Sequence, residues 1–182
     1  MIRIFLFSIL FVQVLFGYNY NSLLLKADAT IFPKIMLMDK KIKNKLIDNK
    51  IIYTIVYDQC DYETAIHVKE YIENTFQKYM DRYPYKVDLA EFSHLSLATK
   101  ASAFYVLKSS TENIKKAANI ARQKGIISFS YDINNLKYDL LFSLVIENST
   151  ILYLNKEYLH TNNIDFVDSL LSMVRFIGKK SI

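Results

Sequence analysis

Four stretches of the chain space their apolar residues three and four positions apart, as an amphipathic helix does. The predicted helices cover about residues 22–38, 62–80, 109–124 and 165–177. Ser22 and Asp61 stand where N-terminal caps of the first two are expected, and Gly125 follows the third, where a left-handed glycine commonly ends a helix. Pro33 falls inside the first pattern, so we expect that helix to kink or end near Phe32.

Between these helices lie short runs rich in β-branched and aromatic residues, the composition of buried strands. They cover residues 51–57, 85–89, 101–107, 126–131, 140–146 and 151–154, and the turn residues 147–150 join the last two into a hairpin. The order of strand, helix, strand, strand, helix, strand favours parallel pairing with helices on both faces of a sheet. We expect one α/β domain over residues 18–182: a three-layer α/β/α sandwich with a mostly parallel sheet and an antiparallel C-terminal hairpin.

The first 17 residues have the layout of a secretory signal peptide. Arg3 supplies one positive charge, an apolar run covers residues 4–16, and the small residue Gly17 follows. The run is shorter than the roughly 20 apolar residues that a membrane-spanning helix needs. We therefore expect export to the periplasm and cleavage near Gly17, so that the mature chain begins near Tyr18. An uncleaved anchor is the alternative.

Composition narrows the classes of function. Hydrophobic residues make up 52% and charged residues 23% of the chain, which excludes disordered and low-complexity classes. Three isolated glycines are too few for a P-loop or a dinucleotide fingerprint, and no cofactor is expected. The net charge is +5, but the densest basic run, residues 40–45, contains no aromatic on which a base could stack. We expect a solvated loop there and no nucleic-acid partner; contact with anionic headgroups or an acidic partner is the alternative.

Three histidines are candidates for catalytic or metal-binding roles. His67 shares a predicted helix face with Glu63 and Glu70, which suits a solvated ion-pairing face better than a metal site with a single imidazole. His94 and His160 fall in predicted loops, and no G-x-S-x-G turn exposes a serine for His94 to activate. We expect no catalytic residue, no metal site and no enzymatic activity.

The only cysteine, Cys60, has no partner for an internal disulfide. We expect a buried thiol that behaves as a small hydrophobic side chain. A homodimer joined through Cys60, or a thiol activated near a helix N-terminus, is the alternative.

Short stretches of the chain resemble the YfiR-like family of exported bacterial regulators. The second hairpin strand closes on Asn155, and after a spacer the last predicted helix carries Ser169, Leu170 and Leu171, as in that family. Residues 24–27 are similar to the family's first mature helix. The chain departs from the family pattern at residues 136–139, which replace the usual glycines, and at residues 32–33, which stand for an aromatic–proline helix end.

The resemblance implies a non-enzymatic periplasmic protein that binds and restrains the ectodomain of an inner-membrane signalling protein, typically a diguanylate cyclase. The residues themselves leave a second class open, a small solute-binding module. Its ligand would lie at the carboxyl ends of the strands near residues 58–61, with Ser109, Ser110 and Thr111 holding an anion at a helix N-terminus. Helix capping is the alternative role of these three residues.

Overall fold

The computed structural model describes residues 17–161 and 164–178, so residues 1–16 of the predicted leader lie outside the described part. Eight strands form one sheet in the order β2-β3-β1-β4-β5-β6-β7-β8. The strands are β1 (Ile51–Tyr57), β2 (Tyr79–Met80), β3 (Tyr83–Glu91), β4 (Ala103–Val106), β5 (Ile127–Ser130), β6 (Phe142–Ile146), β7 (Thr150–Asn155) and β8 (Arg175–Ile177). The α-helices are α1 (Ser22–Met36), α2 (Tyr62–Phe76), α3 (Thr111–Lys124), α4 (Lys156–Thr161) and α5 (Asp168–Met173). Four 3₁₀ turns complete the chain: η1 (Ile42–Lys45), η2 (Gln59–Asp61), η3 (Phe92–His94) and η4 (Ile133–Tyr138).

The sheet is mostly parallel, which confirms the expected fold class. Five central strands run parallel to one another, in the order β3, β1, β4, β5 and β6. Strands β6 and β7 form the antiparallel hairpin. Two short strands extend the sheet at its edges: β2 pairs antiparallel with β3, and β8 pairs parallel with β7.

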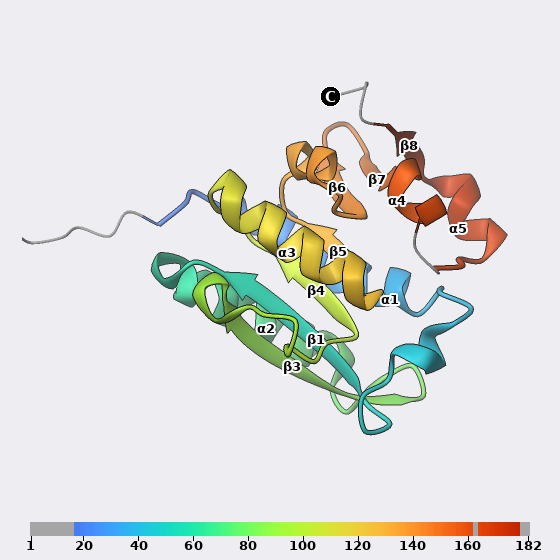
Figure 1. Ribbon diagram of the computed structural model, residues 1–182, viewed down its shortest axis with the longest axis horizontal. Coiled ribbons are helices and arrows are strands. Elements are labelled where there is room, and N and C mark those ends of the chain that lie inside the picture. Colours follow the sequence, from blue (N-terminus) through green and yellow to red (C-terminus); the bar gives the residue numbers. More distant parts are fainter. Residues whose placement is uncertain (1–16, 162–163, 179–182) are drawn as a thin grey trace, which may run out of the picture.

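Helices cover both faces of this sheet. In Figure 1, α3 lies in front of the central strands, whereas α1 and α2 lie behind them. Two apolar clusters fill the two interfaces, and consecutive strand residues alternate between them: Tyr105 of β4 packs with α1 and α2, whereas Phe104 packs with α3. Because both faces are covered, β4 is buried along its whole length, as central parallel strands are. Among the described helices, none is long and apolar enough to span a membrane.

Helix α1 differs from its prediction at both ends. Asn21, not Ser22, is the N-cap, because the Asn21 side chain accepts a hydrogen bond of 3.1 Å from the Leu24 amide. Pro33 does not end the helix near Phe32; the helix continues to Met36. The missing amide of Pro33 costs only one bond in the final turn, and both Phe32 and Pro33 are buried against the sheet.

Helix α3 confirms the predicted start and stop. The Ser110 hydroxyl accepts a hydrogen bond of 3.3 Å from the Asn113 amide. Gly125 adopts the left-handed conformation, with φ of 65°, and its amide bonds back to the last turn. These capping signals act within four residues of each helix end, so the sequence alone is enough to predict them.

Helix α2 is shorter than predicted. It ends at Phe76, where Gln77 takes a positive φ of 51°, and the next residues form β2 instead of a further helical turn. Tyr79 and Met80 pair with Pro84 and Tyr83 across a tight turn. The helical spacing of Met80 is therefore coincidental: its side chain is buried in the core from a strand.

The predicted C-terminal helix over residues 165–177 is largely wrong. Only Asp168–Met173 is helical, and Arg175–Ile177 forms the edge strand β8. A free edge of β7 supplies hydrogen-bonding partners, and branched and aromatic residues suit a strand. A further short helix, α4, follows the hairpin, so the backbone of His160 lies in a helix and not in a loop.

Candidate functional site

The strand order reverses at β1, which creates a topological switch point. The chain passes from β1 to β3 on one side, and then crosses to β4 on the other side. In open α/β sheets, ligands bind outside the carboxyl ends of the strands at such a point. Here β1 is followed by Asp58 and β4 by Leu107 and Lys108, so the structure brings together the two loops from which a ligand site was predicted.

The chain's own N-terminal segment lies at this switch point. We call residues 17–21 the N-terminal arm. The Tyr18 amide donates a hydrogen bond of 3.0 Å to Asp61 Oδ1, and the Tyr20 hydroxyl donates one of 2.9 Å to Asp61 Oδ2. The Lys108 amide donates in turn to the Tyr20 hydroxyl at 3.0 Å, and Lys108 Nζ donates to the Asn19 carbonyl at 2.7 Å. The arm therefore joins the loop after β1 to the loop after β4.

Tyr131, at the end of β5, holds the other end of the arm. Its hydroxyl accepts a hydrogen bond of 2.8 Å from the Asn21 amide. Its ring meets the Tyr20 ring edge to face, with centroids 4.9 Å apart, and the Lys108 ammonium lies 5.2 Å from the Tyr131 ring centroid. Aromatic and cation–π contacts of this kind add to the hydrogen bonds.

Asp61 is the most unusual polar group of this site. It is 2% exposed, and no lysine or arginine of the described residues forms an ion pair with it. Desolvation by burial raises the pKa of its carboxyl group, and the hydrogen bonds from Tyr20 and Tyr18 act in the opposite direction. The sequence suggested Asp61 as a helix cap, but its side chain makes no cap bond.

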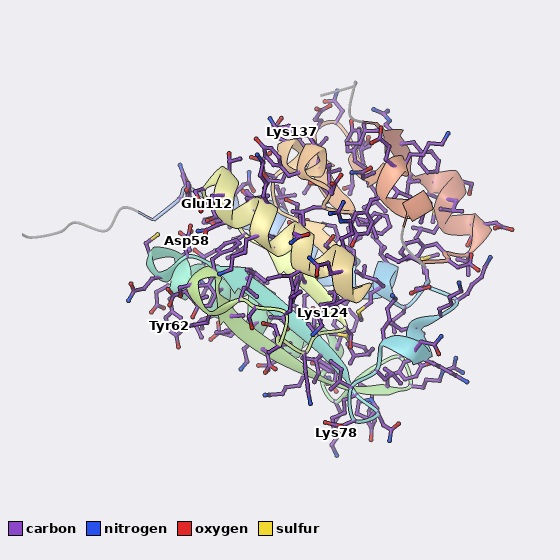
Figure 2. All side chains as sticks on the ribbon, in the orientation of Figure 1. Asp58, Tyr62, Lys78, Glu112, Lys124 and Lys137 are labelled. Carbon is purple, nitrogen blue, oxygen red and sulfur yellow. The ribbon has the colours of Figure 1, made fainter. Side chains whose placement is uncertain are left out.

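Ser109, Ser110 and Thr111 are engaged in local structure. Asn113 Nδ2 donates to Ser109 Oγ at 2.9 Å and to Asp58 Oδ1 at 3.1 Å, and Ser110 caps α3. Thr111 is the first residue of α3. Figure 2 shows Asp58 near the end of α3 that carries Glu112, whereas Lys124 lies toward the other end. The contacts of the three residues are those of helix capping, and the anion site remains a prediction.

The histidines lie apart from the switch-point contacts. His67, Glu63 and Glu70 are all exposed on α2. His94 is exposed at the end of η3, where the Ser93 hydroxyl donates to Glu91 at 2.7 Å. Within the described part of the chain, no group of three histidine, cysteine or acidic residues could hold a metal ion.

Cys60 is half-buried in η2, in contrast to the fully buried thiol that the sequence suggested. Burial raises the pKa of the Cys60 thiol, and the carboxylates of Asp61 and Asp58 raise it further. A raised pKa opposes formation of the thiolate, the nucleophilic form.

An apolar groove adjoins the arm. It has a volume of about 470 Å³ and lies between the start of α1, the end of β5 and the strand β6. Its apolar lining consists of Leu23, Leu24, Ile133, Leu144, Val145 and Ile146. The Leu23 side chain is 63% exposed, which is high for a leucine beside a concave apolar surface. Sequence reasoning missed this groove because its residues come from four separate segments.

A second cavity, of about 620 Å³, lies at the opposite end of the central strands, next to the residues that precede β1, β4 and β5. Lys41, Lys45, Lys100 and Lys124 line it together with the carboxylate of Asp48. The basic run at residues 40–45 was expected to be a solvated loop, but the Lys45 side chain is only 11% exposed. Lys45 Nζ donates to the Gly125 carbonyl at 2.5 Å and lies 3.8 Å from Asp39 Oδ2.

Comparison with known proteins shows the fold alone. The sequence matches no known family, and no curated protein gives a significant match. The chain is similar to a crystal structure described as a conserved domain protein from Vibrio cholerae O1 biovar El Tor, with a TM-score of 0.59 and 12% identity over 84% of this chain and 59% of that chain. It is also similar to the ABC domain in complex with L-Trp from Streptococcus pneumonia, with a TM-score of 0.51 and 11% identity over 78% of this chain and 61% of that chain. The chain thus spans about three-fifths of the length of either structure.

Proposed function

We propose that the protein is an exported, non-enzymatic regulator that binds the periplasmic part of an inner-membrane signalling protein, typically a diguanylate cyclase. The apolar groove beside the arm carries this proposal. It places a 63% exposed Leu23 next to half-buried Leu24, Val145 and Ile146 on a concave surface. A groove that combines these apolar residues with polar lining residues such as Lys108 and Asp132 suits contact with another protein.

The switch point beside the groove supports the same proposal. In many α/β proteins it receives a small molecule. Here the polar groups around Asp61 and Lys108 bond to the arm of the same chain. Asn155 and residues 169–171 resemble the corresponding positions of the YfiR-like regulators, and this resemblance suggests that the partner is an inner-membrane signalling protein.

Deletion and complementation in the native organism test the proposal. Deleting the gene should change the cellular cyclic di-GMP level and surface attachment, and the wild-type gene should restore both. The Leu23→Glu variant should fail to restore them, because it places a charge in the groove, and its melting temperature should stay near wild type, because Leu23 is exposed. Affinity capture with the tagged mature chain should recover the signalling protein with wild type and lose it with this variant.

Leu97→Glu is the matched control. Leu97 is 55% exposed and lies outside the groove, so the same change should leave signalling and capture unaffected. Equal behaviour of the two variants would rule out the groove as the contact surface. An unchanged cyclic di-GMP level in the deletion strain would rule out this class of partner.

The histidines test the non-enzymatic part of the proposal. Substituting His67, His94 and His160 together by Gln should leave the signalling output close to wild type. Loss of output through a single histidine, in a protein that still folds and still binds its partner, would require an enzymatic or metal-dependent mechanism instead.

Binding of a small anion is a second candidate function, favoured by the lysine cavity. Four ammonium groups and one carboxylate line it. Burial lowers the pKa of Lys45, the nearby Asp39 carboxylate raises it, and Lys41 lowers it to a smaller extent. Lys124 Nζ donates to the carbonyls of Leu97 at 2.8 Å and Thr99 at 2.6 Å, which uses two of its three N–H groups. An anion with several negative charges would offset this concentration of positive charge.

Calorimetric titration with inorganic pyrophosphate tests the second candidate. We expect saturable binding that weakens on the order of tenfold when Lys100 and Lys124 are both replaced by Gln, because each lost charge-assisted hydrogen bond weakens binding. The control variant replaces the exposed Lys78 and Lys137 by Gln. It has the same net charge as the variant at Lys100 and Lys124, and it should bind pyrophosphate as the wild type does. Equal weakening by both pairs would indicate nonspecific attraction by the net charge.

A further inference from the structure

The backbone nitrogen of Tyr18 lies against a buried carboxylate that forms no ion pair with any of the residues that the structure describes. It is 3.0 Å from Asp61 Oδ1, while Asp61 Oδ2 accepts the Tyr20 hydroxyl at 2.9 Å. Asp61 is 2% exposed. Lys108 is the charged residue that contacts the arm. Its ammonium donates to the Asn19 carbonyl and lies over the rings of Tyr20 and Tyr131. A buried carboxylate without a cationic partner is costly, so this arrangement lacks a positive charge.

Position 17 is sterically restricted at the same place. A Cβ atom on Gly17 would lie 3.0 Å from Asp61 Oδ1 and 3.0 Å from the Cys60 carbonyl oxygen. Any side chain there would crowd the carboxylate. Glycine at this position fits both the close packing and the small residue that precedes a signal-peptide cleavage site.

Cleavage between Gly17 and Tyr18 would supply the missing charge. Hydrolysis by a signal peptidase consumes one water molecule, leaves a carboxylate on Gly17 and converts the Tyr18 amide nitrogen into a primary amine. An α-amino group has a pKa of roughly 8, so it is mostly protonated at neutral pH. The cation would form on the nitrogen that already lies at hydrogen-bonding distance from Asp61.

We propose that cleavage of the Gly17–Tyr18 bond creates an ion pair between the new α-ammonium of Tyr18 and the buried carboxylate of Asp61, and that this pair holds the arm over the switch point more tightly than the amide hydrogen bond of the unprocessed chain does. The unprocessed chain has one neutral N–H group at this position, whereas the processed chain has a charged ammonium with three N–H groups. The arm continues into Asn21 and Leu23, which line the apolar groove, so processing also stabilises one wall of that groove. The ion pair rests on the export that the proposed function includes, but not on the identity of the partner.

The pH dependence has a defined sign. Besides Asp61, the groups that face the arm are the Asp58 carboxylate, the Cys60 thiol, the hydroxyls of Tyr20 and Tyr131, and the Lys108 ammonium. Pairing with Asp61 raises the pKa of the α-amino group above its unfolded value of roughly 8. Its contribution to stability is therefore fully present below about pH 8, and it is lost as the pH rises through the folded pKa.

Three forms of the purified chain test the ion pair without any partner protein. One begins at Tyr18 with a free amine, released from a fusion by a protease that leaves no extra residue. The second carries an acetyl group on Tyr18, and the third begins at Gly17. At pH 7 we expect the free Tyr18 form to melt roughly 5 °C or more above the other two, which is the scale for breaking a buried ion pair in a chain of this size. The difference should disappear above the folded pKa of the amine.

Asp61→Asn should remove the difference between the free and acetylated forms, whereas Asp58→Asn, in the same loop, should preserve it. NMR titration of ¹⁵N-labelled Tyr18 in the wild-type chain gives the amine pKa directly, so the inference stays testable if Asp61→Asn does not fold. Equal melting of free and acetylated forms at pH 7, an unshifted amine pKa, or a native N-terminus other than Tyr18 would each overturn it.

Discussion

The Tyr105 hydroxyl of β4 donates a hydrogen bond of 2.7 Å to the Asp28 carboxyl group of α1 inside the apolar interface between helix and sheet. Both residues are completely buried. Asp28 Oδ1 and the nearby Tyr53 hydroxyl have no hydrogen-bond partner. Burial raises the pKa of the Asp28 carboxyl well above its usual range, and the bond from Tyr105 opposes this only in part. The folded protein therefore favours the protonated, neutral form of Asp28.

This relationship predicts how stability depends on pH. A carboxyl group whose folded pKa is raised contributes stability below its unfolded pKa of about 4, and that contribution is lost as the pH rises through the folded value. Asp28→Asn keeps an acceptor for Tyr105 without the charge. We expect this variant to be more stable than wild type at pH 8 by on the order of 1–3 kcal/mol, the cost of an uncompensated buried polar group.

Urea denaturation between pH 4 and pH 9 measures this effect. Asp81→Asn is the control, because Asp81 lies in the exposed turn after β2 at a positive φ of 55°, which asparagine also tolerates. The control should follow the wild-type pH dependence. A parallel pH dependence of Asp28→Asn and wild type would show that Asp28 is not the titrating group.

The left-handed backbone of Gly125, at the end of α3, predicts that substitution by an L-residue lowers stability. At φ of 65°, an L-residue costs about 1–2 kcal/mol, so Gly125→Ala should lower the free energy of unfolding by this amount. The nearest atom to the added methyl group is Lys45 Nζ at 3.9 Å, an ordinary contact, so steric crowding adds little. Gly178→Ala, whose Cβ would lie 3.7 Å from Glu157 Oε1, is the control and should be close to neutral. Equal effects of the two substitutions in urea denaturation would exclude the backbone explanation.

Phe129 of β5 predicts a large packing effect. Its ring stacks on those of Phe32, at a centroid distance of 4.6 Å, and Phe142, at 5.6 Å, and the residue is fully buried. Phe129→Ala should cost about 3–5 kcal/mol, because it opens a cavity in the centre of the core. Phe176, in the edge strand β8, is 46% exposed, and Phe176→Ala should cost much less. Comparable losses in chemical denaturation would contradict the position of Phe129 at the core centre.

The surroundings of Cys60 predict a thiol that reacts slowly and that the fold does not need. Because burial and the neighbouring carboxylates raise its pKa, it should react with a disulfide reagent at pH 8 more slowly than free cysteine does. Cys60→Ser should change stability by about 1 kcal/mol or less, as the side chain is only half-buried. A covalent dimer on a non-reducing gel, or a loss of several kcal/mol, would contradict this assignment.

Much of the fold follows from signals that act over a few residues. Ser110 and Gly125 bound α3 as expected, because a cap and a left-handed stop depend on atoms within one helical turn. The strand at residues 51–57 follows from its branched and aromatic composition, and the alternation of strands and helices indicated the layered, mostly parallel sheet. The loops predicted to meet at the carboxyl ends of β1 and β4 do meet there.

Tertiary structure decided the features that depend on distant partners. Residues 175–177 became a strand because β7 offers a free edge whose paired residues lie 22 positions away in sequence, which periodicity within a segment does not reveal. The contact of Tyr18 with Asp61 spans 43 residues, the bond between Asp28 and Tyr105 spans 77, and that between Lys45 and Gly125 spans 80. Local pattern determines most helices and the central strands, whereas the edge strands β2 and β8, and the burial and charge environment of each side chain, arise only when the sheet brings separate segments together.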